Sequence, residues 1–423
     1  MSLWRNGDFL RLWSAQTISQ VGSQITALAL PLAAILVLDA TAFEVAALTA
    51  VEWTPWLLFS LPAGAWVDRL PRRKVLVVTD LGRAATLVSI PLAYALDALT
   101  LGQLYAVGFL TGVLTVFFEV AYVAYLPSLV ERRRLAEGNA KLETTRSAAQ
   151  LGGPGIAGLL VQLFSAPVAI LADGVSFVAS ALFLARIRGR EEVRERVADS
   201  RLRTEVLEGI RFVLGHPYMR PSMAFVATSN FFYNVMFSIL LVYAVRSLDL
   251  DAATIGIVFT LGNIGVLLGA LVATRVGALL GVGRTIVLTA FMLGWPTLLI
   301  PAAPADLAIP VFVAVFAVIG FSGVVTNVVG VSLFQATTPD RLQGRATASR
   351  RLVNFGAVPL GSLAGGGLAA TIGLRETLWV GAVGATLAFL PVLFSPIRHV
   401  REVPEEEPEQ VPAPPTLGPD PVS

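Results

Sequence analysis

The sequence predicts an all-α integral membrane protein whose twelve transmembrane helices form two pseudo-symmetric six-helix bundles. Three observations lead to this prediction: an apolar composition, apolar runs of spanning length along most of the chain, and basic residues confined to alternate loops. Of the 423 residues, 55% are hydrophobic and only 14% are charged, whereas a soluble protein is about 25% charged. This composition excludes both an ordinary soluble globule and a disordered chain.

A membrane helix needs about 20 mainly apolar residues, because the hydrocarbon core is about 30 Å thick. Runs of this kind lie at residues 12–38, 43–67, 75–97, 101–126, 142–164, 166–186, 219–246, 253–276, 284–301, 307–335, 351–373 and 376–395. The first run carries Gln16, Gln20 and Gln24, so it is too polar and too long for a cleaved signal peptide. Every run is therefore interpreted as part of the membrane domain.

Arginine and lysine set the orientation, since cytoplasmic loops carry an excess of them. They cluster at residues 69–74, 132–141, 186–220, 275–284 and 341–351 and near both termini, while the alternate loops carry only Arg246 and Arg375. The sequence thus predicts a multi-pass protein of the cell (plasma or inner) membrane with both termini in the cytoplasm.

The longest loop divides the spans six and six. We expect an N-terminal bundle over 1–186, a central cytoplasmic loop over 187–218, a C-terminal bundle over 219–395 and a disordered tail over 396–423. Within the loop, Leu202, Val206, Ile210 and Val213 form one apolar stripe, which predicts an amphipathic helix that lies flat on the membrane or simply links the halves. The tail holds eight prolines and a run of glutamates, a composition typical of disorder.

An internal duplication is also visible. A single offset of 205 residues pairs Gly64 with Gly269, Arg146 with Arg351, and Pro154 with Pro359, at matching places in the hydropathy pattern. Parallel six-helix repeats normally place a substrate path at the interface between the halves, near the middle of the membrane.

The junction between spans two and three has the spacing G-x-x-x-D-R-x-x-R-R-K, from Gly64 to Lys74. Taken alone it is a positive loop whose charges can pair across a seam between helices. It resembles the signature loop of the major facilitator superfamily, with Pro71 where a glycine is usual. The resemblance implies a cytoplasmic gate that stabilises the outward-open state, formed by Gly64, Asp68, Arg69, Arg72 and Arg73.

The resemblance covers about residues 6–395. The start (Asn6, Phe9, Trp13) and the stretches at 208–217 and 339–345 are similar to the drug–proton antiporter branch that includes macrolide and enterobactin exporters. On span five, Gly153, Pro154 and Gly158 resemble the superfamily's antiporter motif, although glycines also simply permit close helix packing. The resemblance implies export driven by protons.

Three carboxylates inside the spans, Glu52, Glu119 and Asp173, have no basic residue within one helical turn. Such a group in a low-dielectric span can hold a proton near neutral pH, so each is a candidate for proton coupling, with a structural carboxyl as the rival interpretation. By contrast, Asp80 with Arg83 and Glu143 with Arg146 are expected to be structural ion pairs.

Polar residues that a substrate could contact are the second set of candidates. Asn230, Asn234 and Asn327 could hydrogen-bond a ligand from inside their spans. In the superfamily, spans one, four, seven and ten line the cavity, and this resemblance favours Gln20, Glu119, Asn234 and Asn327 as lining residues. Each asparagine could equally hold helices together. Glu119 is the first choice for coupling because its span is expected to line the cavity.

Several functions are disfavoured. There is no cysteine, and His216 and His399 lie outside the spans, so no metal site is expected. There is no phosphate-binding loop, so ATP hydrolysis is not expected. No cofactor and no arrangement of catalytic residues typical of an enzyme is expected either. The basic residues sit between apolar runs, which points away from nucleic acid. The sequence favours a monomeric secondary transporter that exports an amphipathic drug, siderophore or other small molecule across the lipid bilayer. The alternatives are an importer, a lipid translocator, or a non-transporting receptor or scaffold.

Overall fold

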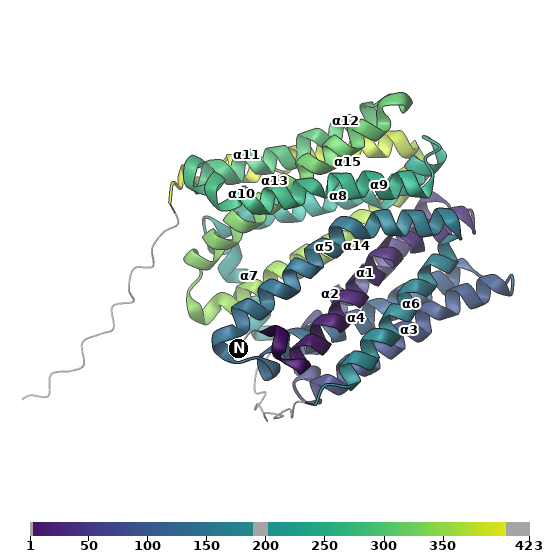
Figure 1. Cartoon of the computed structure of the whole chain (residues 1–423). Helices are drawn as coiled ribbons and strands as arrows, with labels where there is room; N and C mark the ends of the chain where they lie inside the picture. Colours follow the sequence, from purple (N-terminus) through teal and green to yellow (C-terminus); the bar gives the residue numbers. More distant parts are fainter. Residues whose placement is uncertain (1–2, 189–201, 403–423) are drawn as a thin grey trace, which may run out of the picture.

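The protein is known from a computed structural model that describes residues 3–188 and 202–402, apart from the side chains of 61, 65, 202–207, 340 and 341. The described residues form helices and no strand. Figure 1 shows two layers of long helices, with α5 and α14 running between them. Both ends of the described chain lie at the same end of the bundle, called here the terminal end; the other is the opposite end.

The first half contains six long helices. They are α1 (Gly7–Leu36), α2 (Ala42–Val67), α3 (Arg72–Ala95), α4 (Leu101–Leu129), α5 (Leu135–Leu163) and α6 (Ala166–Ala185). Helix α1 begins at Gly7 rather than at residue 12 because the Asn6 side chain accepts hydrogen bonds from the backbone N–H groups of Asp8 and Phe9. Helix α2 begins at a capping box, in which Thr41 and Glu44 satisfy each other's backbone N–H groups.

The second half repeats this order with two interruptions. Its elements are α8 (Met219–Arg246), α9 (Ala252–Gly262) with α10 (Ile264–Leu280), α11 (Val282–Gly294) with η3 (Trp295–Leu298) and α12 (Leu299–Ala302), α13 (Ala308–Thr337), α14 (Asp340–Ile372), and α15 (Leu374–Leu387) with α16 (Leu390–Leu393). The second span breaks at Asn263, and the third changes to 3-10 geometry at Pro296. Ten segments of the described chain are long and apolar enough to cross a membrane, and α2 and α5 run alongside them. The fold is therefore an all-α membrane fold consistent with twelve spans.

The contacts between halves are pseudo-symmetric. Helix α5, the fifth of the first half, packs on α9, the second of the other half, and α14 packs on α2 in the same way. The sequence pairs Arg146 with Arg351 and Pro154 with Pro359 fall on α5 and α14 respectively. The packing thus agrees with the duplication inferred from the sequence.

Helix α7 (Leu202–Gly215) is the helix expected in the central loop, but the described part of its apolar stripe does not face outward. Val213 is 2% exposed and packs with Met219 and Ala346, and a Cβ at Gly209 would lie 2.5 Å from the Arg345 carbonyl oxygen. Helix α7 therefore packs closely on α8 and α14. The prediction that this face lies flat on the membrane is wrong for Val213; the side chains of Leu202 and Val206 lie outside the described residues.

The first residues of the expected disordered tail are ordered. Ile397 is fully buried, and the N–H groups of Val282 and Gly283 donate to the carbonyl oxygens of Arg401 and Val400. The start of the tail thus covers the first turn of α11. Residues 403–423 lie outside the described part of the chain.

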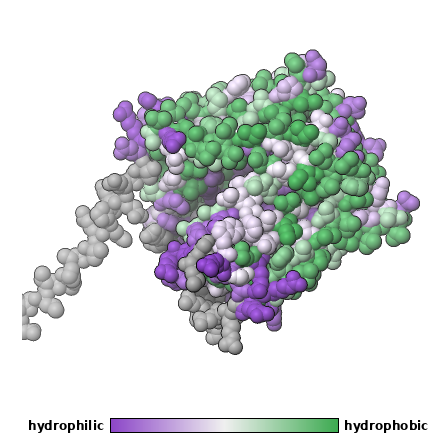
Figure 2. Space-filling view, in the orientation of Figure 1, coloured by the Kyte–Doolittle hydropathy of each residue, from purple (hydrophilic) through white to green (hydrophobic). Residues whose placement is uncertain are grey.

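The two halves pack together most closely at the opposite end. There, one apolar core joins α1 residues from Ile25 to Ile35 with Val242, Ala252 and Ile255 of the second half. Figure 2 shows apolar side chains along the flanks, whereas hydrophilic ones lie at both ends, most densely at the terminal end, and around a hollow between the layers.

Candidate functional site

The predicted proton-coupling and substrate-contacting residues, apart from Asn234, line three separate cavities. We name them after their polar residues: the carboxylate cavity of about 490 Å³, the glutamine cavity of about 450 Å³ and the arginine cavity of about 730 Å³. All three have the size of small-molecule sites.

The carboxylate cavity brings Glu52 and Asp173 together. Asp173 on α6 is 1% exposed and accepts hydrogen bonds from Thr26 Oγ1 at 2.5 Å and Ser176 Oγ at 2.9 Å. A bare carboxylate could not be buried here without such donors. Helix α1 supplies Thr26, so Asp173 also ties the first helix to the sixth.

Glu52 lies on α2 in the wall of the same cavity, against α4. A Cβ at Gly108 would stand 3.0 Å from Glu52 Cγ, so the glycine makes the room that the side chain occupies. Its carboxylate has no hydrogen bond or ion pair with any described residue, and the described lining holds aromatic rings such as Trp53 and Trp56 but no basic side chain. Two acids without a cation therefore share this space.

Glu119 is placed differently. It lines the glutamine cavity with Gln16, Gln20, Glu143 and Arg146, from α1, α4 and α5. Arg146 lies on α5, far from Glu119 in sequence, so the sequence did not reveal that a cation shares the cavity with Glu119. Gln16 is 4% exposed, and neither of its amide atoms has a hydrogen-bond partner in the structure.

Only one of the two expected structural ion pairs forms. Arg83 and Asp80 are hydrogen-bonded and buried, and the Arg83 guanidinium lies over the rings of Phe118 and Phe177 at 4.2 and 4.0 Å. Glu143 and Arg146 both face the glutamine cavity without an ion pair between them, contrary to expectation. Sequence spacing permits an i,i+3 pair, but side-chain direction decides it.

The arginine cavity lies in the second half and is lined by Asn230, Asn327 and Asn354 among others. Asn230 Nδ2 donates to Asn354 Oδ1 at 2.8 Å and to the Val226 carbonyl oxygen at 3.0 Å. Asn234 does not line any of the three cavities. Its Nδ2 donates to the Asn230 carbonyl oxygen at 2.8 Å, and its Cβ packs where α14 approaches at Gly361, so its expected role as a lining residue is not supported.

The glycine motif on α5 makes the contact between halves. A Cβ at Gly158 would lie 2.3 Å from the Ala252 carbonyl oxygen on α9, and one at Gly153 would lie 2.4 Å from Gln24 Cβ on α1. On the α9 side, Gly256 is equally constrained, since its Cβ would lie 2.4 Å from the Pro154 carbonyl oxygen. Backbones therefore meet directly at this seam.

Two hydrogen bonds cross the seam beside Pro154. Because proline has no N–H, the Gln150 carbonyl oxygen loses its usual helical partner, and Asn263 Nδ2 from the other half donates to it at 2.7 Å. The Gly155 N–H donates to Thr260 Oγ1 at 2.9 Å. Sequence reasoning missed Thr260 and Asn263; the available signal was an asparagine inside an otherwise apolar run.

An ion pair closes the same end of the molecule. Arg246 Nη2 lies 2.6 Å from Asp39 Oδ1 and also donates to the Ala40 carbonyl oxygen at 2.9 Å. Arg246 ends α8 and Asp39 follows α1, so this pair joins the two halves.

At the terminal end, Asp68 and Arg72 of the expected gate contact each other and the first half. Arg72 lies 3.8 Å from Asp68 and donates to the Ala124 carbonyl oxygen at 3.0 Å, and Arg73 donates to the Ile187 carbonyl oxygen. Arg69 is exposed, and a Cβ at Gly64 would meet nothing within 4 Å. Among the described residues, Asp68 and Arg72 therefore make no ion pair with the second half.

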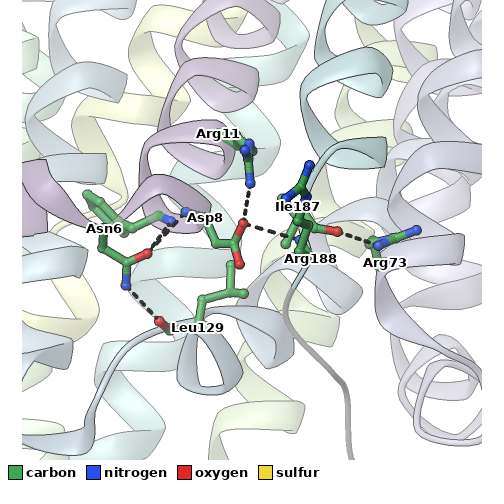
Figure 3. Close-up of polar contacts among 8 residues, drawn as sticks. Asn6, Asp8, Arg11, Arg73, Leu129, Ile187 and Arg188 are labelled. Atoms are coloured by element: carbon green, nitrogen blue, oxygen red, sulfur yellow. Dashed lines mark hydrogen bonds and ion pairs between the residues drawn. The ribbon is translucent and has the colours of Figure 1, made fainter.

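Figure 3 shows the neighbouring contacts that hold the terminal end of the first half. Asp8 accepts hydrogen bonds from Arg11 at 2.6 Å and from the Arg188 N–H at 3.2 Å, and Asn6 Nδ2 donates to the Leu129 carbonyl oxygen at 3.2 Å. Nearby, hydrogen bonds from Arg134 hold the pKa of Glu137 below its ordinary value. Charges at this end are thus paired locally.

No group of three or more His, Asp or Glu side chains stands together as a metal site in the described residues. His216 lies between α7 and α8, and His399 lies in η5 (Pro396–His399), on opposite sides of the second half's sequence.

Comparisons with known proteins agree with this architecture. The profile of a family described as transmembrane secretion effectors matches residues 1–418. The multidrug efflux pump Tap of Mycolicibacterium fortuitum is 26% identical over 411 residues, which cover 93% of this chain and 98% of Tap. A bacterial homologue of the iron transporter ferroportin superposes in its inward-facing state with a TM-score of 0.72 at 20% identity, covering 93% of this chain and 99% of its own. Its outward-facing state superposes with a TM-score of 0.59 at 18% identity, covering 91% and 98%.

Proposed function

The chain belongs to the transmembrane secretion effector family of major facilitator transporters, and from this premise we propose that it exports amphipathic small molecules, drugs among them, in exchange for protons. Transport would proceed by alternating access, in which the two halves rock about a central site. The likeness to a multidrug efflux pump over nearly the whole chain supports export rather than import.

The observation that carries the proposal is the asymmetry between the two ends. The opposite end is joined by the Gly158–Ala252 approach, the Pro154 hydrogen bonds and the Asp39–Arg246 pair. At the terminal end, Asp68 and Arg72 are paired within the first half, and the cavities reach the beginnings of α5 and α14 through Asn139 and Gln343. An inward-facing intermediate of a transport cycle has this arrangement.

The orientation of the protein in the membrane follows from the charges at these two ends. The terminal end carries the arginine and lysine clusters, so we assign it to the cytoplasm, in a plasma or inner membrane. Reporter fusions after residues 70, 135, 200 and 340 should read cytoplasmic, and those after 40, 98, 250 and 305 external. An external reading at 200 would overturn the orientation.

Coupling is proposed to run through Glu52 and Asp173. Both line one cavity beside the closed seam, without a basic side chain in the described lining, whereas Glu119 shares its cavity with Arg146. Protonation of a carboxylate there removes a buried charge and can bias which side the cavity faces. This arrangement moves the first choice from Glu119 to the Glu52–Asp173 pair.

Proton movement in proteoliposomes tests the proposal directly. Purified protein is reconstituted into vesicles whose interior is made more acidic than the outside. A pH-sensitive dye then reports the pH gradient while antimicrobial compounds are added one at a time. At least one compound should dissipate the gradient faster than protein-free vesicles allow, and the Glu52→Gln/Asp173→Asn variant should abolish this effect. Compound-independent flux or no flux with any compound would contradict proton-coupled export, and compound that leaves the vesicles together with protons would identify a symporter.

A further inference from the structure

The arginine cavity has a charge opposite to that of the carboxylate cavity. Arg350 and Arg351 line it, and the described lining contains no acidic side chain. Neither arginine has an ion pair with a described residue. Glu208, whose side chain is described on the adjacent α7, is already paired with Arg345.

The neutral side chains of this cavity add hydrogen-bond donors. Asn354 Oδ1 accepts a hydrogen bond from Asn230, so the amide nitrogen of Asn354 points away from Asn230 and remains a donor. Asn327 lines the same cavity and has no hydrogen bond with a described residue. The Arg350 guanidinium is held near the Phe334 ring, 5.5 Å from its centroid. Arginine forks and amide N–H groups are the donors that recognise carboxylate, phosphate and sulfonate groups.

The rest of the wall is apolar and adaptable. Met219, Met223, Phe225 and Phe334 contribute to a space of about 730 Å³, which suits a drug-sized molecule. A ligand that satisfies this cavity needs an anionic group at one end and an apolar body at the other.

We propose that the arginine cavity binds amphipathic organic anions through Arg350, Arg351 and Asn354. The inference rests on the proposed transport function for its physiological meaning, since it assigns the charge class of the transported molecule to the second half. An anionic lipid headgroup at the same place would use the same chemistry. A lipophilic cation would meet two unpaired guanidinium groups and be repelled.

Equilibrium binding tests this with two dyes that share a xanthene ring system but differ in charge. The protein is placed in phosphatidylcholine nanodiscs, and the fluorescence anisotropy of carboxyfluorescein, an anion, and of rhodamine 123, a cation, is titrated. Carboxyfluorescein should bind saturably and at least about ten-fold more tightly than rhodamine 123. Equal affinities, preference for the cation or absence of saturable carboxyfluorescein binding would overturn the proposal.

Variants locate the binding. Arg350→Gln/Arg351→Gln should raise the carboxyfluorescein Kd at least about ten-fold, and Arg350→Lys/Arg351→Lys should keep much of the affinity. The matched control, Arg275→Gln/Arg284→Gln, removes two exposed charges of the same half outside the cavity and should bind as the wild type does. Unchanged binding in the first variant would contradict the assignment.

Lipid composition distinguishes the source of the anion. If replacing half of the phosphatidylcholine by phosphatidylglycerol weakens carboxyfluorescein binding, the cavity holds an anionic headgroup; if it does not, the cavity selects a free anion. Because these measurements need no gradient, a chain that binds the anion but moves no protons would refute the proposed function alone. A chain that moves protons but prefers the cation would refute this inference alone.

Discussion

The two ends of the bundle hold the halves together by different means. At the opposite end, glycine backbones touch across α5 and α9, and the hydrogen bonds around Pro154 cross the seam. At the terminal end, Asp68 and Arg72 contact each other and α4 instead of the second half. Contacts through small residues and a few hydrogen bonds can form and separate with little repacking, and locally paired charges can exchange partners. In the proposed cycle, this difference corresponds to a state in which the seam is closed and the terminal end is open.

The largest expected effect comes from forcing the glycine seam apart. Gly158→Leu places a side chain against the Ala252 backbone, which cannot yield as a flexible side chain would. Transport should be abolished, because the opposite end can no longer close.

The matched control is Gly152→Leu on the same helix, where a Cβ meets nothing within 4 Å. It should keep most of the transport and the thermal stability of the wild type. Equal behaviour of the two variants, measured as substrate-driven proton flux and Tm, would show that the seam contact has no functional role.

The next largest effect should distinguish the acids of the carboxylate cavity from the acid of the glutamine cavity. Glu52→Gln and Asp173→Asn should each remove most of the proton-coupled efflux, since the proton-binding group is lost, while substrate binding in nanodiscs persists. Glu119→Gln should impair transport less, because Glu119 lies with Arg146 in the glutamine cavity. If only Glu119→Gln uncouples transport, the two cavities have the reverse roles.

A smaller effect is expected at the gate. Asp68 is half exposed and 3.8 Å from Arg72 here, so Asp68→Asn should leave the inward-facing state intact and destabilise the outward-facing one. Charge-assisted contacts of this kind are worth about 1–3 kcal/mol, so the transport rate should fall by about ten-fold at normal expression. Normal transport in this variant would leave the loop with only a topological role.

The smallest effect is expected at Asp39, whose side chain is 95% exposed although it pairs with Arg246. Exposed pairs contribute about 0.2–1 kcal/mol and are screened by salt. Asp39→Asn should therefore change transport by less than about five-fold, and the difference should vanish in high salt. The charge-swapped Asp39→Arg/Arg246→Asp protein should transport like the wild type; a complete loss in Asp39→Asn would contradict a minor role.

The sequence predicted what depends on composition and local pattern. Hydropathy located the helices, and the three acids that it singled out inside the spans, at 52, 119 and 173, all lie in cavity walls. It did not predict which side chains from distant helices meet. Arg146 joins Glu119 only through the packing of α5 on α1 and α4, and Asn263 finds Gln150 only because Pro154 frees its carbonyl oxygen. Asn234 illustrates the same limit, since it lies one helical turn after the cavity-lining Asn230 on α8 and yet makes a helix contact instead.

The central claim is that the seam and the gate alternate, and electron–electron spin distances measure this directly. The chain has no cysteine, so label pairs can be introduced without further changes. One pair, Lys74→Cys with Gly344→Cys, spans the halves at the terminal end, and the other, Ala98→Cys with Ala305→Cys, spans them at the opposite end; all four positions are exposed. Shifting the pH or adding a transported compound should shorten the terminal-end distance while the opposite-end distance lengthens. Distances that change together in the same direction, or not at all in a transporting protein, would contradict the account.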